Sequence, residues 1–274
     1  AQKMILLTPP KKAMKLINKI NSIINFLGFY PLKLYNNLTG LFFYFNDLRK
    51  LKNQKGKDST FVFGKKYPML NDRCSEAGTI KGHYFFQDLF VAQKIFNSQP
   101  KKHVDIGSRI DGFVAHVASF REIEVFDIRK ISSQVKEIKF HQKDFMQLDD
   151  SFIEYCDSIS SLHAIEHFGL GRYGDPIDYY GHIKAISNIT KMLKKNGTLH
   201  FSAPIGKQRI EFNAHRVFAI HYLLNLFKKD YKLLNFSYVD DNGDFFQNVR
   251  LDEKNIKHNF NCNWGCGIFE LVKL

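Results

Sequence analysis

Cysteine is scarce in this sequence, and long uninterrupted apolar runs are missing. The four cysteines among 274 residues are Cys74, Cys156, Cys262 and Cys266. So sparse a set indicates a reducing compartment rather than a disulfide framework. Cys262 and Cys266 could ligate a metal, but no second pair with suitable spacing accompanies them, so we predict no metal site.

A membrane span and a signal peptide are also not evident. The apolar stretch 16–45 is interrupted by Asn, Lys and Pro31, and it falls short of the roughly eighteen apolar residues that a spanning helix needs. We therefore expect a cytoplasmic protein. The heptapeptide MKLINKI, beginning at Met14, resembles a natural start, which predicts that residues 1–13 are an added tag.

Basic residues are abundant but not clustered. Lys and Arg exceed Asp and Glu, for a net charge of +13, which predicts attraction to an anionic partner such as nucleic acid, membrane lipid or a phosphorylated substrate. The lysines form no long basic run, and no RNA-binding module or basic-aromatic face is recognisable. This pattern argues against a nucleic-acid partner.

The N-terminal part predicts an extension over residues 1–58, followed by a main domain over 59–274. Apolar residues between 16 and 27 fall at helical spacing, a turn is expected at 36–40, and an aromatic patch follows at 41–45. Residues 50–59 are polar and predict a linker. Two interpretations stay open: a helical extension packed on the main domain, or an interfacial helix in peripheral contact with a membrane.

The stretch 102–127 organises the main domain. It predicts a strand at 103–106, a turn between Gly107 and Gly112, a helix at 113–120 and a strand at 123–126 that stops at Asp127. Such a unit, closed by an acid about twenty residues after its first glycine, is typical of sites for nucleoside-bearing cofactors. Arg109 stands where a second glycine would let a pyrophosphate approach, which favours a cofactor without a diphosphate.

Further strands and helices alternate along the rest of the chain. We predict strands at 137–140, 158–162, 198–202, 231–239 and 267–272, and helices at 84–96, 179–193 and 216–227. This alternation predicts an α/β fold: a Rossmann-like, doubly wound, mostly parallel seven-stranded sheet with an antiparallel last strand.

At this point the sequence resembles the class I S-adenosylmethionine-dependent methyltransferases. VDIGSRIDG resembles their first motif, VFD the second, KDF the adenine-contacting segment, and MLKKNGTLHFSAP the segment before the fifth strand. The resemblance implies S-adenosylmethionine as the cofactor, with contacts from Asp105, Gly107, Ser108, Asp127, Asp144, Phe145, Ser161 and Leu162. Within the superfamily, segments such as LHAIEHFGLGRYGDPID resemble a bacterial subfamily of unknown function suspected of acting on cell-surface glycans.

The chemistry of methyl transfer to a hydroxyl points to a histidine base, because its pKa lies near working pH. His163 is the best-placed candidate, at the carboxyl end of the fourth predicted strand; His215 is the second, and Glu166 is expected to orient either one. The substrate-binding candidates are His83, Tyr84, Asp88, Arg172, Arg209 and Arg216. HAIEH also matches the H-x-x-E-H pattern of zinc peptidases, but it leads into a glycine-rich loop with too little helix for that geometry.

Three functions remain open at this stage. The first is an O-methyltransferase acting on a sugar, a nucleotide sugar or a surface polysaccharide precursor of capsule or lipopolysaccharide. The second is an RNA methyltransferase. The third is a methyltransferase-fold protein that has lost donor binding, through Arg109, and acts in glycan assembly. The oligomeric state is not predicted.

Overall fold

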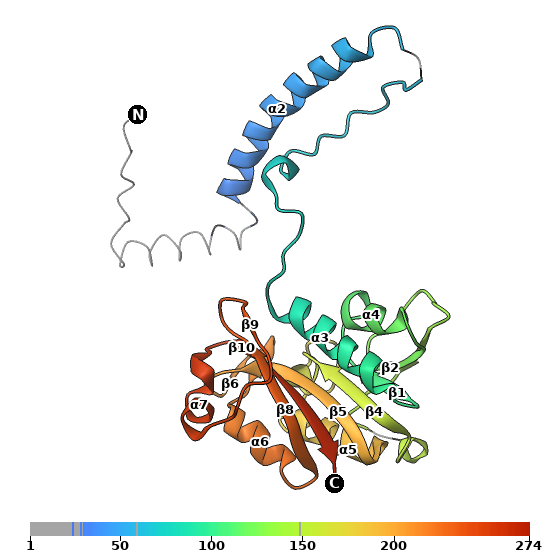
Figure 1. Ribbon diagram of the computed structural model, residues 1–274, viewed down its shortest axis with the longest axis vertical. Coiled ribbons are helices and arrows are strands. Elements are labelled where there is room, and N and C mark those ends of the chain that lie inside the picture. The colour runs from blue at the N-terminus through green and yellow to red at the C-terminus, as the bar shows by residue number, and fades with distance from the viewer. Residues whose placement is uncertain (1–23, 25–27, 29, 59, 148) are drawn as a thin grey trace. The chain divides into compact units, whose positions relative to one another are not determined.

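The computed structural model describes residues 24, 28, 30–58, 60–147 and 149–274 (Figure 1). Most of the helix predicted at 16–27 therefore lies outside the described residues. The chain divides into two compact units, Ala1–Thr79 and Ile80–Leu274. Among the described residues no helix is long and apolar enough to cross a membrane.

The first unit is built around one helix, α2 (Pro31–Lys55), which starts with a proline where its missing N–H costs nothing. The turn predicted at 36–40 is wrong, because the helix runs through it, and the linker expected from residue 50 begins only after Lys55. Gly40 serves packing instead of turning: a Cβ there would lie 2.3 Å from the backbone oxygen of Leu70.

The segment that follows α2 runs back along this helix and contacts it, so it belongs to the first unit. Asn71 donates a hydrogen bond to Asn37 over 2.9 Å, and Arg73, after a short 3₁₀ turn (Asp72–Cys74), pairs with Asp47. Residues 60–79 thus belong with the helix. The boundary predicted after residue 58 is replaced by one after Thr79.

The second unit is a twisted α/β sheet, as predicted, with strand order β3-β2-β1-β4-β5-β10-β8-β9. The strands are β1 (His103–Ile106), β2 (Ile123–Asp127), β3 (Ile138–Gln142), β4 (Cys156–Leu162), β5 (Leu193–Ile205), β8 (Tyr231–Val239), β9 (Phe245–Phe246) and β10 (Gly265–Lys273). Strands β1 to β5 are parallel, and β10 is antiparallel to both β5 and β8. The seven predicted strands are confirmed; the two-residue β9 adds an eighth at the edge.

Helices cover both faces of this sheet (Figure 1). On one face lie α3 (His83–Ser98) and α4 (Ala115–Ala118), and on the other α5 (Gly181–Met192) and α6 (Ile220–Phe227). Each face has its own core: Val91, Ile95, Phe113 and Ile123 on the first, and Ile159, Ile189, Phe201 and Phe269 on the second. A short α7 (Glu253–Lys257) and 3₁₀ turns at Asp150–Phe152, Ile165–His167 and Asn259–Asn261 complete the unit.

Two predicted helices differ in length from the structure. The helix expected at 113–120 begins instead as a π-turn (Ile110–Val114) and ends at Ala118, and Gly112 inside that turn is non-helical. The helix expected from residue 216 begins at Ile220, because His215–Val217 (β7) pairs with Arg209–Glu211 (β6) as a two-stranded ribbon. These departures shape the loops at the carboxyl ends of the parallel strands.

Candidate functional site

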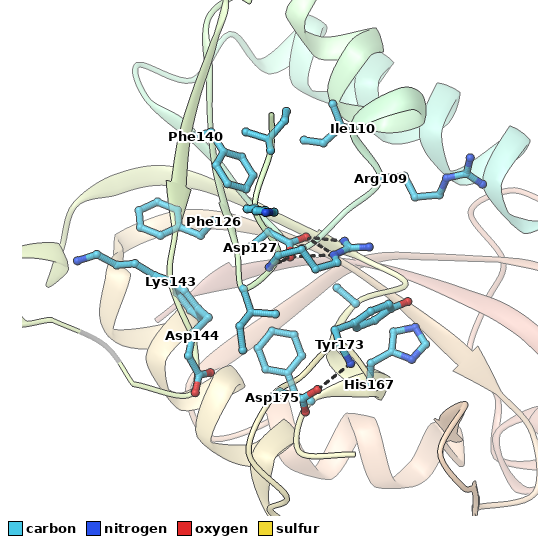
Figure 2. Close-up of a pocket in the computed structure, with 18 of the residues that line it drawn as sticks. Arg109, Ile110, Phe126, Asp127, Phe140, Lys143, Asp144, His167, Tyr173 and Asp175 are labelled. Atoms are coloured by element: carbon cyan, nitrogen blue, oxygen red, sulfur yellow. Dashed lines mark hydrogen bonds and ion pairs between the residues drawn. The ribbon is translucent and has the colours of Figure 1, made fainter. Parts of the chain in front are cut away.

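A cavity of about 600 Å³ opens beyond the carboxyl ends of β1, β2 and β4 (Figure 2). In open α/β sheets this is the edge where ligands bind. Its lining residues are Tyr84, Gly107, Arg109, Ile110, Asp111, Phe126 to Ile131, Ser133, Phe140, Lys143 to Phe145, His163, Ala164, His167, Phe168, Arg172, Tyr173 and Asp175.

The turn after β1 brings the backbone to the cavity wall. Gly107 has φ +72°, a conformation that favours glycine, and its N–H donates to the carbonyl of Phe126 over 2.9 Å. A Cβ at this position would lie 3.0 Å from that of Ala164. Glycine is therefore favoured here for two reasons: the positive φ and the close approach of the Ala164 side chain.

Asp105 and Ser108 are buried and stabilise this turn through hydrogen bonds. The Asp105 carboxylate accepts hydrogen bonds from the Ser108 N–H (2.9 Å), the Ser108 hydroxyl (2.6 Å) and the Ser160 hydroxyl (2.6 Å). Complete burial raises the pKa of Asp105 to about 7. Neither residue is among those that line the cavity, so both position the turn rather than contact a ligand directly.

Asp127, at the end of β2, is the predicted ribose acceptor and does line the cavity. Its carboxylate accepts from the Arg129 backbone N–H over 2.8 Å and pairs with the Arg129 guanidinium at two points, Nε to Oδ1 (2.9 Å) and Nη2 to Oδ2 (2.5 Å). The Arg129 guanidinium also lies over the Tyr173 ring, 4.6 Å from its centroid. Arg129 was missed from the sequence, although an arginine two residues after the acid is a readable signal.

Arg109 does not plug the cavity. It pairs with Asp111 (Nη2 to Oδ2 2.8 Å), lies 5.1 Å from the centroid of the Tyr84 ring, and keeps about half of its side chain exposed. In Figure 2 its guanidinium points away from Asp127. The cavity that Arg109 helps to line is open. Loss of donor binding would require Arg109 to fill it, so the structure does not favour that hypothesis.

The predicted adenine contacts lie at the opposite side of the cavity. Asp144 and Phe145 both line it, as do Phe140 and Lys143, and Figure 2 shows Asp144 next to Lys143. The Asp144 carboxylate accepts from the Met146 N–H over 2.9 Å, which fixes the local turn. A flat apolar group thus finds phenylalanine rings and a nearby acceptor.

Ser161 and Leu162 are buried in β4 rather than exposed to the cavity. The Ser161 hydroxyl donates to the carbonyl of Ile106 over 3.0 Å, and the Leu162 N–H donates to the Ser108 hydroxyl over 3.1 Å. Their predicted contact with the methyl group is replaced by a role in joining β1 to β4.

His163, the next residue, does line the cavity. It has φ +49°, which is uncommon outside glycine, and its Nδ1 lies 2.7 Å from Glu166 Oε1. This is the orienting contact predicted for Glu166, whose side chain is almost fully buried. Neighbouring His167 is fixed by a bond between its Nδ1 and the carbonyl of Ala214 (2.6 Å).

His83, Asp88 and His215 are near this corner but do not line the cavity. The His83 ring stacks on His163 with centroids 5.1 Å apart, and burial lowers the pKa of His83 to about 4. Burial raises the pKa of Asp88 to about 6. His215 Nε2 accepts from the Trp264 indole N–H over 3.0 Å. Tyr84, by contrast, lines the cavity as predicted.

Of the three predicted substrate arginines, only Arg172 lines the cavity. It donates to the carbonyl of Ala214 over 2.9 Å. Arg209 is bound to Glu211 and to the carbonyl of Asn263. Arg216 is buried and donates to main-chain carbonyls, among them that of Phe168 at 2.6 Å. The last two therefore stabilise loops and do not reach the cavity.

The fold and the cavity define a Rossmann-like α/β protein with a ligand site beyond the first two strands. Residues 114–263 match the model of the DUF268 family, described as Caenorhabditis protein of unknown function. The match covers more than half of the chain, so this protein belongs to that family. This match does not show the glycan-linked bacterial subfamily that the sequence resemblance suggested. A search of curated proteins found no match.

Solved structures with a similar chain path come from enzymes of the same general fold. The [4+2]-cyclase SpnF is 13% identical, with 63% of this chain and 75% of that one covered and a TM-score of 0.44. The N-methyltransferase NodS of Bradyrhizobium japonicum, with S-adenosylhomocysteine, is 13% identical (82% and 97% covered, TM-score 0.47). The 1,6-didemethyltoxoflavin-N1-methyltransferase of Burkholderia thailandensis is 11% identical (68% and 78%, TM-score 0.48).

Proposed function

We propose that this protein is an S-adenosylmethionine-dependent methyltransferase that acts on a hydroxyl of a sugar, a nucleotide sugar or a polysaccharide precursor. The observation that carries the proposal is convergence in one cavity. Gly107, Asp127, Asp144 and Phe145 come from three separate strand ends and all line it, and His163 lines it too. These are positions that the sequence resemblance assigns to the donor and to catalysis.

The residues divide the task of holding the donor. Gly107, whose missing side chain leaves room at the cavity wall, would hold the methionine end, Asp127 would accept hydrogen bonds from ribose hydroxyls, and Phe145 and Asp144 would hold the adenine. S-adenosylmethionine, when bound, supplies an electrophilic methyl group. The protein then has mainly to align the acceptor with it, since orientation supplies much of the rate in such a displacement.

His163 is the group that we assign to activation of the acceptor. It lies at the carboxyl end of β4, its ring is held by Glu166, and it is among the residues that line the cavity. The rim offers an aromatic ring at Tyr84 and a guanidinium at Arg172. Aromatic faces and arginine forks suit a sugar carrying phosphate or carboxylate, which supports a charged carbohydrate acceptor over a neutral small molecule.

The first test is donor binding by isothermal titration calorimetry with S-adenosylhomocysteine. We expect one site of micromolar affinity that Asp127→Asn weakens and Arg250→Ala, an exposed arginine far from the cavity in sequence, leaves unchanged. A folded protein that binds no S-adenosylhomocysteine contradicts the proposal. Mass spectrometry of candidate nucleotide sugars for the gain of one methyl group then tests the acceptor, and methylation of RNA instead would replace that part.

A further inference from the structure

Three buried side chains direct metal-ligating atoms toward one point beside the cavity. They are His83, His163 and Cys266, and one ligand atom of each lies within 4.8 Å of the other two. The first is the opening residue of α3, the second follows β4, and the third is near the start of β10. All three are buried, with Cys266 fully so.

One ring nitrogen in this cluster lacks a partner. Within the described part of the chain, His163 Nε2 is buried and makes no hydrogen bond. A buried polar atom without a partner destabilises the fold unless a ligand satisfies it. Its other nitrogen, Nδ1, is paired with Glu166 Oε1 at 2.7 Å. A carboxylate on one nitrogen and a free second nitrogen is the arrangement that metal-ligating histidines show.

The same residues also resemble a nucleophile, base and orienting acid, but burial argues against that use. Cys266 has no exposed surface, and its thiol faces the Gln87 side-chain oxygen at 3.6 Å. An acyl or glycosyl substrate could not reach the sulfur. A small ion needs only the space between the three ligand atoms.

We propose that His83, His163 and Cys266 form a binding site for a borderline-soft divalent cation, with Zn²⁺ as its best-fitting ion, and that Glu166 positions His163. Two imidazoles and one thiolate are a ligand set that zinc accepts, with Zn–N near 2.0–2.1 Å and Zn–S near 2.3 Å. Tetrahedral ligands at these lengths are about 3.3–3.6 Å apart, so side-chain rotations that move the ligand atoms by about 1 Å close the site. Binding takes up the thiolate and releases the thiol proton.

Three protein ligands leave the fourth position open, and catalytic zinc sites share that feature. His83, His163 and Cys266 are all buried, so we expect water or a small anion in this position. A His163 that ligates the ion has no free nitrogen, because Glu166 holds the other one, so the metal-loaded protein would not use His163 as the base of the proposed function. The metal site itself does not depend on methyl transfer, and the expectation of no metal from the sequence is replaced by this proposal.

The test uses the full chain, stripped of metal and titrated with Zn²⁺ and, separately, Co²⁺. We expect one equivalent of Zn²⁺ at submicromolar dissociation constant and a thiolate-to-cobalt charge-transfer absorption. Cys266→Ser removes that absorption and weakens Zn²⁺ at least about 30-fold. Glu166→Gln weakens it about 10–100-fold. Cys262→Ser, a change at a second buried cysteine outside the cluster, leaves both readouts unaltered.

Two outcomes overturn the proposal. One is a cobalt spectrum of the wild-type protein that lacks the charge-transfer absorption. This measurement does not depend on whether any variant folds. The other is loss of metal on Cys262→Ser equal to that on Cys266→Ser. Calorimetry with S-adenosylhomocysteine on the stripped protein is read separately, so failure of the metal site and failure of donor binding are distinguishable.

Discussion

The ion pair between Asp127 and Arg129 gives the sharpest prediction about the donor site. Ribose hydroxyls and the Arg129 guanidinium compete for the same carboxylate oxygens, because Arg129 Nε and Nη2 already reach both of them. Arg129→Ala removes that competitor and keeps the Arg129 backbone N–H that orients Asp127 at 2.8 Å. We therefore expect this variant to bind S-adenosylhomocysteine more tightly than the wild type.

The size of the effect follows from exposure. The Asp127 side chain is 8% exposed and that of Arg129 45%. A pair with one half-exposed partner contributes about 1 kcal/mol, which corresponds to about a fivefold gain in affinity. Asp127→Asn acts in the opposite direction. Hydrogen bonds to a charged group contribute about 1.5–3 kcal/mol and neutral ones about 0.5–1.5 kcal/mol, so two ribose contacts predict a loss of about 30–150-fold.

Calorimetry on wild type, Arg129→Ala, Asp127→Asn and the surface control Arg250→Ala measures these values directly. Thermal melts of each variant establish that the protein is folded at the titration temperature. A tenfold or greater loss of affinity in Arg129→Ala would refute the competition. It would mean that the arginine contacts the ligand and that Asp127 serves chiefly to hold it.

Three further predictions concern stability and are read by chemical denaturation. Gly169→Ala is expected to lose well over 2 kcal/mol, because φ is +77° and its Cβ would lie 2.0 Å from the backbone oxygen of Asp178; Gly174→Ala, with φ +82° and open space, is expected to lose about 1–2 kcal/mol. Burial raises the pKa of Asp105 to about 7, so its stabilising contribution is complete below its ordinary pKa and is lost as pH rises through about 7. The wild type should lose on the order of 2–4 kcal/mol over that range, and Asp105→Asn should not show this component. Arg216→Met leaves buried carbonyls unpaired and is expected to cost about 2–4 kcal/mol.

Much of the sheet could be predicted from sequence because its strands are short, apolar and regularly spaced. The predicted span 231–239 coincides with β8, and 103–106 coincides with β1. Helix limits were less predictable. The segment 36–40 contains two asparagines and a glycine, typical of a turn, yet it is helical, since Gly40 is needed where Leu70 approaches. A contact made thirty residues away leaves no local pattern.

The candidate site shows the same division between local and distant information. Residues that meet the cavity directly, such as Gly107, Asp127 and Asp144, belong to short motifs and were predictable. Arg209 and Arg216 carry the right charge for a substrate but bind main-chain carbonyls instead. Charge alone does not distinguish an arginine that faces a cavity from one that closes a loop. That distinction depends on the β6–β7 ribbon, and the helix predicted from residue 216 overlaps its second strand.

The meeting of His83, His163 and Cys266 follows from strand direction. A residue at the end of a parallel strand, such as His163, lies at the carboxyl edge of the sheet. A helix that precedes β1 runs back toward its start, so its first residue, His83, lies at that edge too. An antiparallel last strand must begin there: Cys266 pairs with Pro204 near the end of β5. An antiparallel last strand therefore predicts that its cysteine lies beside His163. Spacing along the sequence pairs Cys266 with Cys262, whereas the strand order makes His163 its neighbour.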